Sequence, residues 1–241
     1  MIRFVLSYAL FTAIIGQIAA QSTAYVFHVG PSLGIQKWDN SFERQILYKY
    51  HAALSIESVN NENDNASIYA QIGYHVRGSA TRFRFFFQGG GIQTFSQEFQ
   101  FNNLSLILGA KMKKPLGARG KYFYFGGLRG DYNLSTNLDD LDQNNNPYAA
   151  IYYPQPGFVN KWTAGLSFGG GIELPFSELV GCQFMLSAHP DFLLQYRQPS
   201  IPNVIDPLNP GQNITIPERR IRNLTIELSI GLRLLRKVVY E

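Results

Sequence analysis

Apolar and polar residues alternate strictly along residues 224–234, close to the end of the chain. Every second position is a leucine or an isoleucine: Leu224, Ile226, Leu228, Ile230, Leu232 and Leu234. The positions between them are polar, charged or glycine: Thr225, Glu227, Ser229, Gly231 and Arg233. Successive side chains of a β-strand point to opposite faces, whereas a helix would distribute these leucines around its circumference. The segment is therefore predicted to be a strand with one apolar and one polar face.

The same alternation recurs in seven earlier segments of the chain. These segments are residues 25–35, 46–57, 68–77, 103–112, 122–134, 162–174 and 183–196. Ile107, Phe123 and Phe125 interrupt the pattern, because they are apolar where a polar residue is expected. Pro190, within the last of these segments, is expected to mark a bulge or a local kink. About eight strands of one pattern, following one another along the chain, predict a meander.

The connections between the expected strands alternate between short and long. The short ones are residues 60–65, 113–120 and 175–181, and the long ones are residues 137–160 and 199–217. The third and fourth strands are expected to continue beyond the apolar band into a hairpin around residues 89–91. Short turns on one side and long loops on the other are typical of outer-membrane barrels. This arrangement predicts that the N- and C-termini lie in the periplasm, together with the short turns.

The glycines of the polar face indicate which face meets water. A glycine such as Gly109 or Gly169 weakens a strand and contributes nothing to a solvated surface, but it leaves room in the narrow lumen of a barrel. The apolar face carries aromatic residues near both strand ends, with Tyr124 toward one edge and Trp162 and Tyr196 toward the other. Two aromatic belts around an aliphatic band mark a lipid-facing surface. The predicted fold is all-β: an eight-stranded antiparallel up-and-down transmembrane β-barrel with its polar face inside.

Charged residues and all four histidines of the polar face are expected to form a structural network of polar side chains in this lumen. Acidic and basic residues balance one another there, as charges in a confined space require. The expected network comprises His28, Lys49, His51, Glu57, His75, Arg77, Lys111, Arg129, Asp131, Glu173, His189, Asp191, Glu227 and Arg233.

The first 20 residues have the layout of a cleaved secretory signal. Arg3 supplies a positive charge, an apolar run follows, and small residues precede Gln21. The apolar run is too short for a membrane-spanning helix, which needs about 20 residues. Residues 1–20 are therefore expected to be a signal peptide and residues 21–241 the barrel domain, located in the bacterial outer membrane.

Composition narrows the class of protein further. Charged residues make up only 16% of the chain, whereas about a quarter is usual in soluble domains. The formal net charge of +4 is small and the basic residues are not clustered, so no nucleic-acid partner is expected. Cys182 is the single cysteine, which excludes an intramolecular disulfide. A chain of this kind is expected to contact outer-membrane lipid over much of its surface.

Several stretches resemble a known family in their spacing of glycines and alternating residues. They are "YHAALSIES", "QIGYHVRGSATRF", "FNNLSLILGAKMKK", "YFYFGGLRGDYNL", "WTAGLSFGGGIELPF" and "RNLTIELSIGLRLL". Over nearly the whole mature chain they are similar to the PorT-like outer-membrane β-barrel family of Bacteroidota. The resemblance implies a small eight-stranded barrel and, for some members, a role as an accessory subunit of a type IX secretion or gliding machinery. The chain departs from many outer-membrane barrels because it ends in Tyr240-Glu241 rather than in an aromatic residue.

Candidate chemistry in the expected lumen is weak. Ser187 and His189 lie two apart on one strand, with Glu173 on the neighbouring strand, so a lipid-modifying enzyme is an alternative of another class. A lipid substrate would lie outside the wall, however, and these residues point inward, so a structural network is preferred and no enzyme is expected. His28, His51 and His75 lie on successive strands, but no spacing fixes their heights. No metal site and no cofactor are expected.

The hairpin beyond the apolar band is the candidate binding surface. It places Arg82 and Arg84 among four phenylalanines: Phe83, Phe85, Phe86 and Phe87. Arginine and aromatic residues at an exposed edge favour contacts with proteins or with lipid headgroups. The alternative is that these rings pack against other loops. The sequence therefore predicts a barrel that acts in structure or partner binding through extracellular loops, with another envelope protein as a candidate partner.

Overall fold

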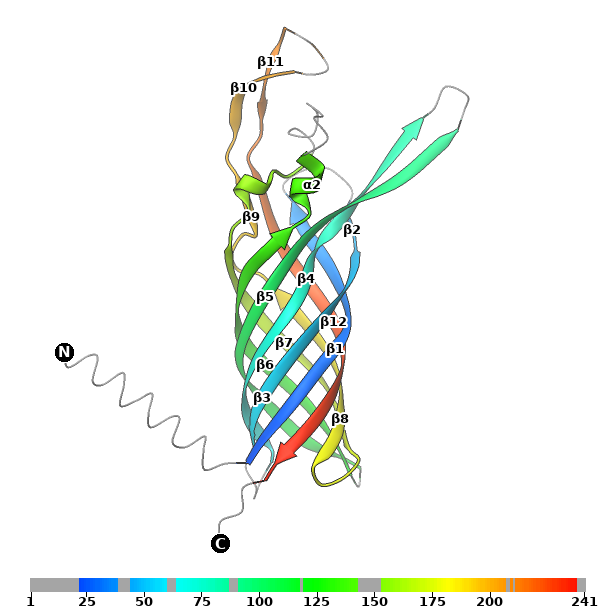
Figure 1. Ribbon diagram of the computed structural model, residues 1–241, viewed down its shortest axis with the longest axis vertical. Helices are drawn as coiled ribbons and strands as arrows, with labels where there is room; N and C mark the ends of the chain where they lie inside the picture. The colour runs from blue at the N-terminus through cyan, green and yellow to red at the C-terminus, as the bar shows by residue number, and fades with distance from the viewer. Residues whose placement is uncertain are drawn as a thin grey trace, which may run out of the picture.

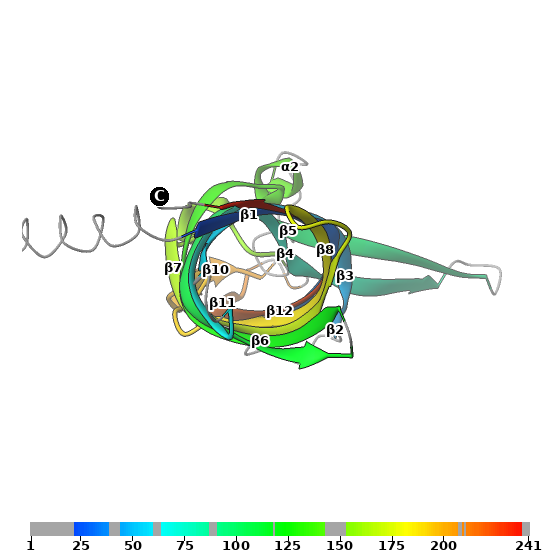
Figure 2. The same ribbon diagram turned by 90° about the horizontal axis from the view of Figure 1, so that it is seen from below.

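The structure is a closed antiparallel β-barrel. The computed structural model describes residues 22–38, 44–59, 64–86, 91–117, 119–142, 153–206, 209 and 211–237. The wall consists of β1 (Ser22–Trp38), β3 (Leu47–Val59), β4 (Ala66–Phe86), β5 (Ile92–Leu116), β6 (Gly120–Thr136), β7 (Trp162–Pro175), β8 (Val180–Pro190) and β12 (Arg219–Arg236). Each strand pairs with the next in this order, and pairing of β12 with β1 closes the ring (Figure 2). The predicted eight-stranded up-and-down barrel is confirmed.

The two ends of the barrel differ in how far the chain extends beyond them (Figure 1). The end at which β1 begins and β12 finishes, here called the termini end, has short connections. At the opposite end, here called the hairpin end, β4 and β5 run on as a two-stranded ribbon. The smaller elements also lie toward the hairpin end: β2 (Arg44–Gln45), α2 (Leu138–Asp142), η1 (Pro156–Phe158), β9 (Tyr196–Gln198), β10 (Ile201–Ile205) and β11 (Asn213–Ile216). Strands β10 and β11 pair with each other in a sheet of their own, which forms a second projecting arm.

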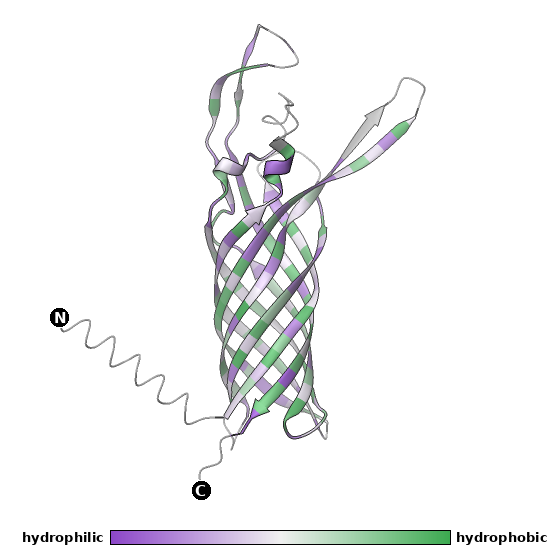
Figure 3. Cartoon of the chain, in the orientation of Figure 1, coloured by the Kyte–Doolittle hydropathy of each residue, from purple (hydrophilic) through white to green (hydrophobic). Residues whose placement is uncertain are grey.

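Apolar side chains of the wall point outward, and polar ones point inward. Ile68 is 74% exposed and Leu128 is 68% exposed, although both lie on paired strands of the wall. Their neighbours Ser67 and Arg129 are buried on the opposite face. Figure 3 shows the resulting alternation of hydrophobic and hydrophilic residues along the barrel strands. No helix within the described residues is long and apolar enough to cross a membrane.

The three interruptions of the sequence pattern meet inside the barrel. Ile107, Phe123 and Phe125 are buried in one cluster with Tyr69 and Met185. These side chains therefore point inward, as their positions along the strands require, but they are apolar rather than polar. The sequence predicted a polar lumen. The structure differs, because this apolar layer lies among the charged layers.

Two glycines on the inward face of β7 provide space for this apolar layer. Gly171 is paired with Phe123, and Gly169 with Phe125. A Cβ atom at Gly171 would lie 2.8 Å from the end of the Phe123 ring, and one at Gly169 would lie 2.9 Å from the end of the Phe125 ring. The backbone oxygens of Phe184 and Leu186 on β8 would be nearer still, at 2.0 and 2.2 Å, so a larger residue would clash with the neighbouring strand as well as with the rings.

The segment 183–196 differs from the expectation of one continuous strand. Strand β8 ends at Pro190, which lacks the N–H group needed to continue the ladder. The chain then turns, and Tyr196 belongs to the short strand β9, where its side chain is fully buried. The prediction that Tyr196 belongs to the lipid-facing aromatic belt is therefore wrong. The predicted signal peptide, residues 1–20, lies outside the described residues.

Candidate functional site

The layer of charges nearest the hairpin end is centred on Asp131. Its Oδ2 atom accepts hydrogen bonds from Arg77 Nη1 at 2.6 Å and from Arg129 Nε at 2.9 Å. Its Oδ1 atom accepts a third from the Ser105 hydroxyl at 2.6 Å. All four side chains are buried. Charge-assisted hydrogen bonds to one carboxylate from two guanidinium groups hold strands β4, β5 and β6 together from the inside.

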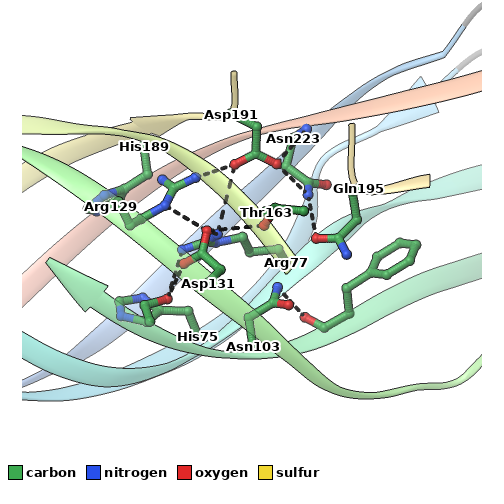
Figure 4. A network of polar contacts seen from close by, with 12 residues as sticks. His75, Arg77, Asn103, Arg129, Asp131, Thr163, His189, Asp191, Gln195 and Asn223 are labelled. Carbon is green, nitrogen blue, oxygen red and sulfur yellow. Dashed lines mark hydrogen bonds and ion pairs between the residues drawn. The ribbon is translucent and has the colours of Figure 1, made fainter. Parts of the chain in front are cut away.

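A second carboxylate completes this layer, as Figure 4 shows. Asp191 pairs with the other side of the Arg129 guanidinium and lies 3.9 Å from Arg77. It also accepts a hydrogen bond from Asn223 Nδ2 at 2.9 Å, which connects β12 to the same group. Two arginines and two aspartates thus form a network without excess charge. Such pairing offsets the cost of removing the four ions from water.

The middle layer consists of histidines around one carboxylate. Glu227 lies 2.7 Å from Nδ1 of His75, 3.1 Å from Nε2 of His189 and 3.8 Å from Nε2 of His51. The rings of His51 and His75, which are directly opposite each other on β3 and β4, are stacked 5.6 Å apart. His28 does not join this group, because its ring contacts Ser55 at 3.2 Å. No set of three or more His, Cys, Asp or Glu side chains among the described residues is arranged to hold a metal ion.

Ser187 and His189 are in contact, but the acid beside them is not Glu173. The Ser187 hydroxyl lies 2.9 Å from Nε2 of His189, and Glu227 approaches the same nitrogen. In a nucleophile–base–acid triad the acid contacts the other ring nitrogen and orients the base. That nitrogen, Nδ1 of His189, has no hydrogen-bond partner among the described residues. The constellation with Glu173 that the sequence suggested is therefore not formed.

The layer nearest the termini end is rich in basic residues. Glu57 forms a short ion pair with Lys111 and lies 3.3 Å from Nζ of Lys113. Glu173 lies 3.5 Å from the same Lys113 atom and 3.3 Å from Nε of Arg233. Sequence reasoning missed Lys113, because it placed this residue in a turn, whereas β5 continues to Leu116. Continuing the alternation from Lys111 by one more step would have identified it.

All but one of the residues predicted to form the polar network lie inside the barrel. Those that are buried, with 8% exposure or less, are His28, His51, Glu57, His75, Arg77, Lys111, Arg129, Asp131, Glu173, His189, Asp191, Glu227 and Arg233. The exception, Lys49, is half-buried and forms an ion pair with Glu98 at 2.8 Å near the base of the ribbon. The structure thus brings thirteen of the fourteen predicted residues to the interior.

An apolar cluster fills the hairpin end of the barrel. Its buried members are Trp38, Phe99, Phe101, Leu138, Tyr196 and Ile221. Here this group is called the aromatic plug. Arg44 stacks on the Trp38 ring with its guanidinium carbon 3.3 Å from the ring centroid. Burial, and then the charge of Arg219, lower the pKa of Arg44 to about 9, so this side chain remains a cation at pH 7 and the contact is a cation–π interaction.

The predicted binding hairpin is present as the β4–β5 ribbon. Pairing continues beyond the barrel from Arg82 opposite Ser96 to Phe86 opposite Ile92, and Arg82 is exposed. Phe83, Arg84, Phe85 and Phe86 lie on the described backbone of β4, whereas Phe87 lies outside the described residues. On the opposing strand, Ile92 is 63% exposed and Phe95 is 39% exposed. The ribbon therefore presents apolar side chains to its surroundings.

The fold is similar to that of small outer-membrane barrels of known structure. Neisserial surface protein A matches with 10% identity and a TM-score of 0.43, over 88% of this chain and 97% of that one. OprG from Pseudomonas aeruginosa matches with 8% identity and a TM-score of 0.46, over 89% and 97%. Ail of Yersinia pestis, solved with the heparin analogue sucrose octasulfate, matches with 11% identity and a TM-score of 0.39, over 89% and 99%.

The sequence itself matches a family of such barrels. A comparison with curated proteins found no match. The model of the family described as outer membrane protein beta-barrel domain, however, matches residues 19–192, which is well over half of the chain. This match agrees with the closed ring of eight strands and its apolar outer face. The chain belongs to the outer membrane protein beta-barrel domain family.

Proposed function

We propose that this chain spans the outer membrane with its termini in the periplasm and acts through its extracellular ribbon as a binding surface for another envelope protein. The orientation rests on the asymmetry between the two ends, since barrels of this class have short periplasmic turns and longer extracellular loops. The packed lumen then serves as a rigid support. Its paired charges, histidines and apolar layer hold the wall from the inside.

The exposed apolar side chains of the ribbon are the observation that carries this proposal. Ile92 and Phe95 are exposed on a ribbon that projects beyond the barrel (Figure 1). Apolar residues gathered on a surface that faces water mark sites of protein contact. The arginines Arg82 and Arg84 on the opposing strand supply the second residue type that is enriched in protein interfaces.

The pairing register allows the ribbon to be removed without disturbing the barrel. Replacing residues 83–95 with Asn-Gly joins Arg82 to Ser96, which are directly opposite each other, through a two-residue hairpin turn. The β10–β11 arm provides a matched control, because Ile201 and Ile216 are also paired and can be joined in the same way. Both variants should keep the heat-dependent shift in gel mobility that reports a folded barrel.

Chemical cross-linking in intact cells then tests the proposal. The shortened ribbon should lose the cross-linked adducts that the full-length chain forms, whereas the shortened arm should keep them. Adducts that persist without residues 83–95 would contradict the assignment of the ribbon as the binding surface.

A further inference from the structure

A pocket of about 210 Å³ opens at the termini end of the barrel, lined in part by residues at the ends of β3, β7 and β12. Four basic side chains line it: Arg119, Lys121, Arg233 and Lys237. Among the described lining residues only Asp64 and Glu173 are acidic. The pocket differs from the layer nearest the hairpin end, where two arginines face two aspartates.

The acidic groups around the pocket are shared among more basic groups than they can neutralise. Asp64 lies 2.8 Å from Nζ of Lys121 and 3.3 Å from Nζ of Lys113, which is buried behind the pocket. Glu173 is likewise shared between Lys113 and Arg233. Lys237 is paired with Glu178, 2.8 Å away, whereas Arg119 forms no ion pair with any described residue. Positive charge is therefore in excess at this site.

Arg233 is the buried donor at the centre of this excess. Its side chain is 9% exposed, and it reaches into the pocket from the inward face of β12. Its Nε atom is buried and has no hydrogen-bond partner among the described residues, because the nearby Glu173 oxygen is 3.3 Å away without the geometry of a hydrogen bond. A buried donor without an acceptor is destabilising, because it has lost its hydrogen bonds to water. An anion in the pocket would supply the missing acceptor.

We propose that this pocket binds a small soluble oxyanion, a carboxylate or a phosphate group, between Arg233 and Arg119. The guanidinium group presents parallel N–H donors that match two oxygens of such an anion. Arg119 and Lys237 lie just outside strands, in the turn before β6 and after the end of β12, so the pocket faces the aqueous end of the barrel. If the termini are periplasmic, as proposed above, the ligand reaches the pocket from the periplasm.

Titration calorimetry of the folded full-length chain tests the proposal without requiring its orientation. The chain is placed in nanodiscs of phosphatidylcholine at low ionic strength and titrated with inorganic phosphate, with acetate and, for comparison, with chloride. Saturable binding of phosphate or acetate, at least tenfold tighter than that of chloride, is the expected result. Binding that is absent, or equal for all three anions, would overturn the proposal.

Three variants assign the binding to the pocket. Arg233→Met should weaken binding at least tenfold, and Glu173→Gln should strengthen it about threefold by removing the competing carboxylate. Should Arg233→Met fail to fold, Arg119→Gln changes only an exposed turn residue and should weaken binding about threefold. Lys114→Gln is the matched control, because Lys114 is exposed on β5 at the same end but does not line the pocket. Equal affinities in Arg119→Gln and Lys114→Gln would place the anion elsewhere and refute the assignment.

Repeating the titration in phosphatidylglycerol nanodiscs distinguishes a soluble ligand from a lipid headgroup. The negative surface potential of these nanodiscs is measured from their electrophoretic mobility. An affinity for phosphate that is unchanged after correction for this potential supports a soluble ligand. If the affinity for phosphate is lower in phosphatidylglycerol even after this correction, and lower still for Glu173→Gln, the lipid phosphate is competing for the pocket. The proposal of a soluble ligand would then be rejected.

Discussion

The two ends of the lumen differ in the balance between acidic and basic residues. Near the hairpin end, two arginines and two aspartates neutralise one another beneath an aromatic plug. Near the termini end, basic residues outnumber acidic ones around an open pocket. The difference follows from access to water. Charge must balance within the protein where water is excluded, whereas an excess of one sign is tolerated where solvent or a ligand can reach it.

The largest effect is expected from removing one charge beneath the plug. Asp131→Asn keeps the size of the side chain but leaves Arg77 and Arg129 with only Asp191 as a charged partner in their layer. Breaking a buried ion pair on one side costs about 3–5 kcal/mol. Urea unfolding in lipid vesicles, followed by the gel-mobility shift, should show this loss. The exposed Asp139→Asn on α2 is the control and should change stability by less than about 0.5 kcal/mol.

Equal stabilities of these two variants would mean that water reaches Asp131. The contrast drawn between the two ends of the lumen would then be wrong.

A smaller effect is expected from opening the plug itself. Trp38→Ala removes the ring that packs on Phe99, with centroids 5.2 Å apart, and that supports Arg44. Truncating a buried aromatic residue costs about 3–5 kcal/mol, and the lower part of this range is expected because Trp38 is not fully buried. The same unfolding assay should show a clearly smaller loss for Trp162→Ala, because Trp162 is 71% exposed on the outer face. A larger loss for Trp162→Ala would show that the outer aromatic belt, rather than the plug, stabilises this end.

The smallest effect is expected at the open end. Glu173→Gln makes the same change of carboxylate to amide as Asp131→Asn, but beside a pocket that water enters. Glu173 is itself buried, but Lys113 keeps Glu57 and Asp64 as partners and Arg233 lines the open pocket, so the loss should be smaller than that of Asp131→Asn. Comparing the two amide variants in one unfolding series measures the contrast directly. A loss at Glu173 as large as that at Asp131 would show that the termini end is as dry as the hairpin end.

Much of the architecture could be predicted from residue alternation. The polar–apolar pattern identified all eight wall strands, the inward face and the extension of the third and fourth strands into a ribbon. The pattern gave a wrong prediction after Pro190, because this proline ends β8 and the chain then turns, which places the Tyr196 side chain within the aromatic plug. It also missed Lys113, because a strand that continues into a turn has no marker at its end.

The composition of the lumen was harder to predict than its existence. Ile107, Phe123 and Phe125 looked like errors in the pattern, yet they lie inward against one another and face the glycines Gly169 and Gly171. Their meeting depends on the stagger of neighbouring strands, which sets the heights of inward residues and which no single strand specifies.

The sequence by itself determined the class of fold, because a period of two over eight segments leaves one face for lipid and one for the interior. It also determined most of the side chains that belong to the interior, although it assigned Lys113 to a turn and Tyr196 to the outer face. Only the tertiary structure decided which of them meet. Closure of the ring and the register between strands placed Glu227 among histidines, Asp131 between two arginines, and an excess of basic groups at the termini end. Those contacts join residues far apart in the chain, so they depend on strand pairing rather than on any local pattern.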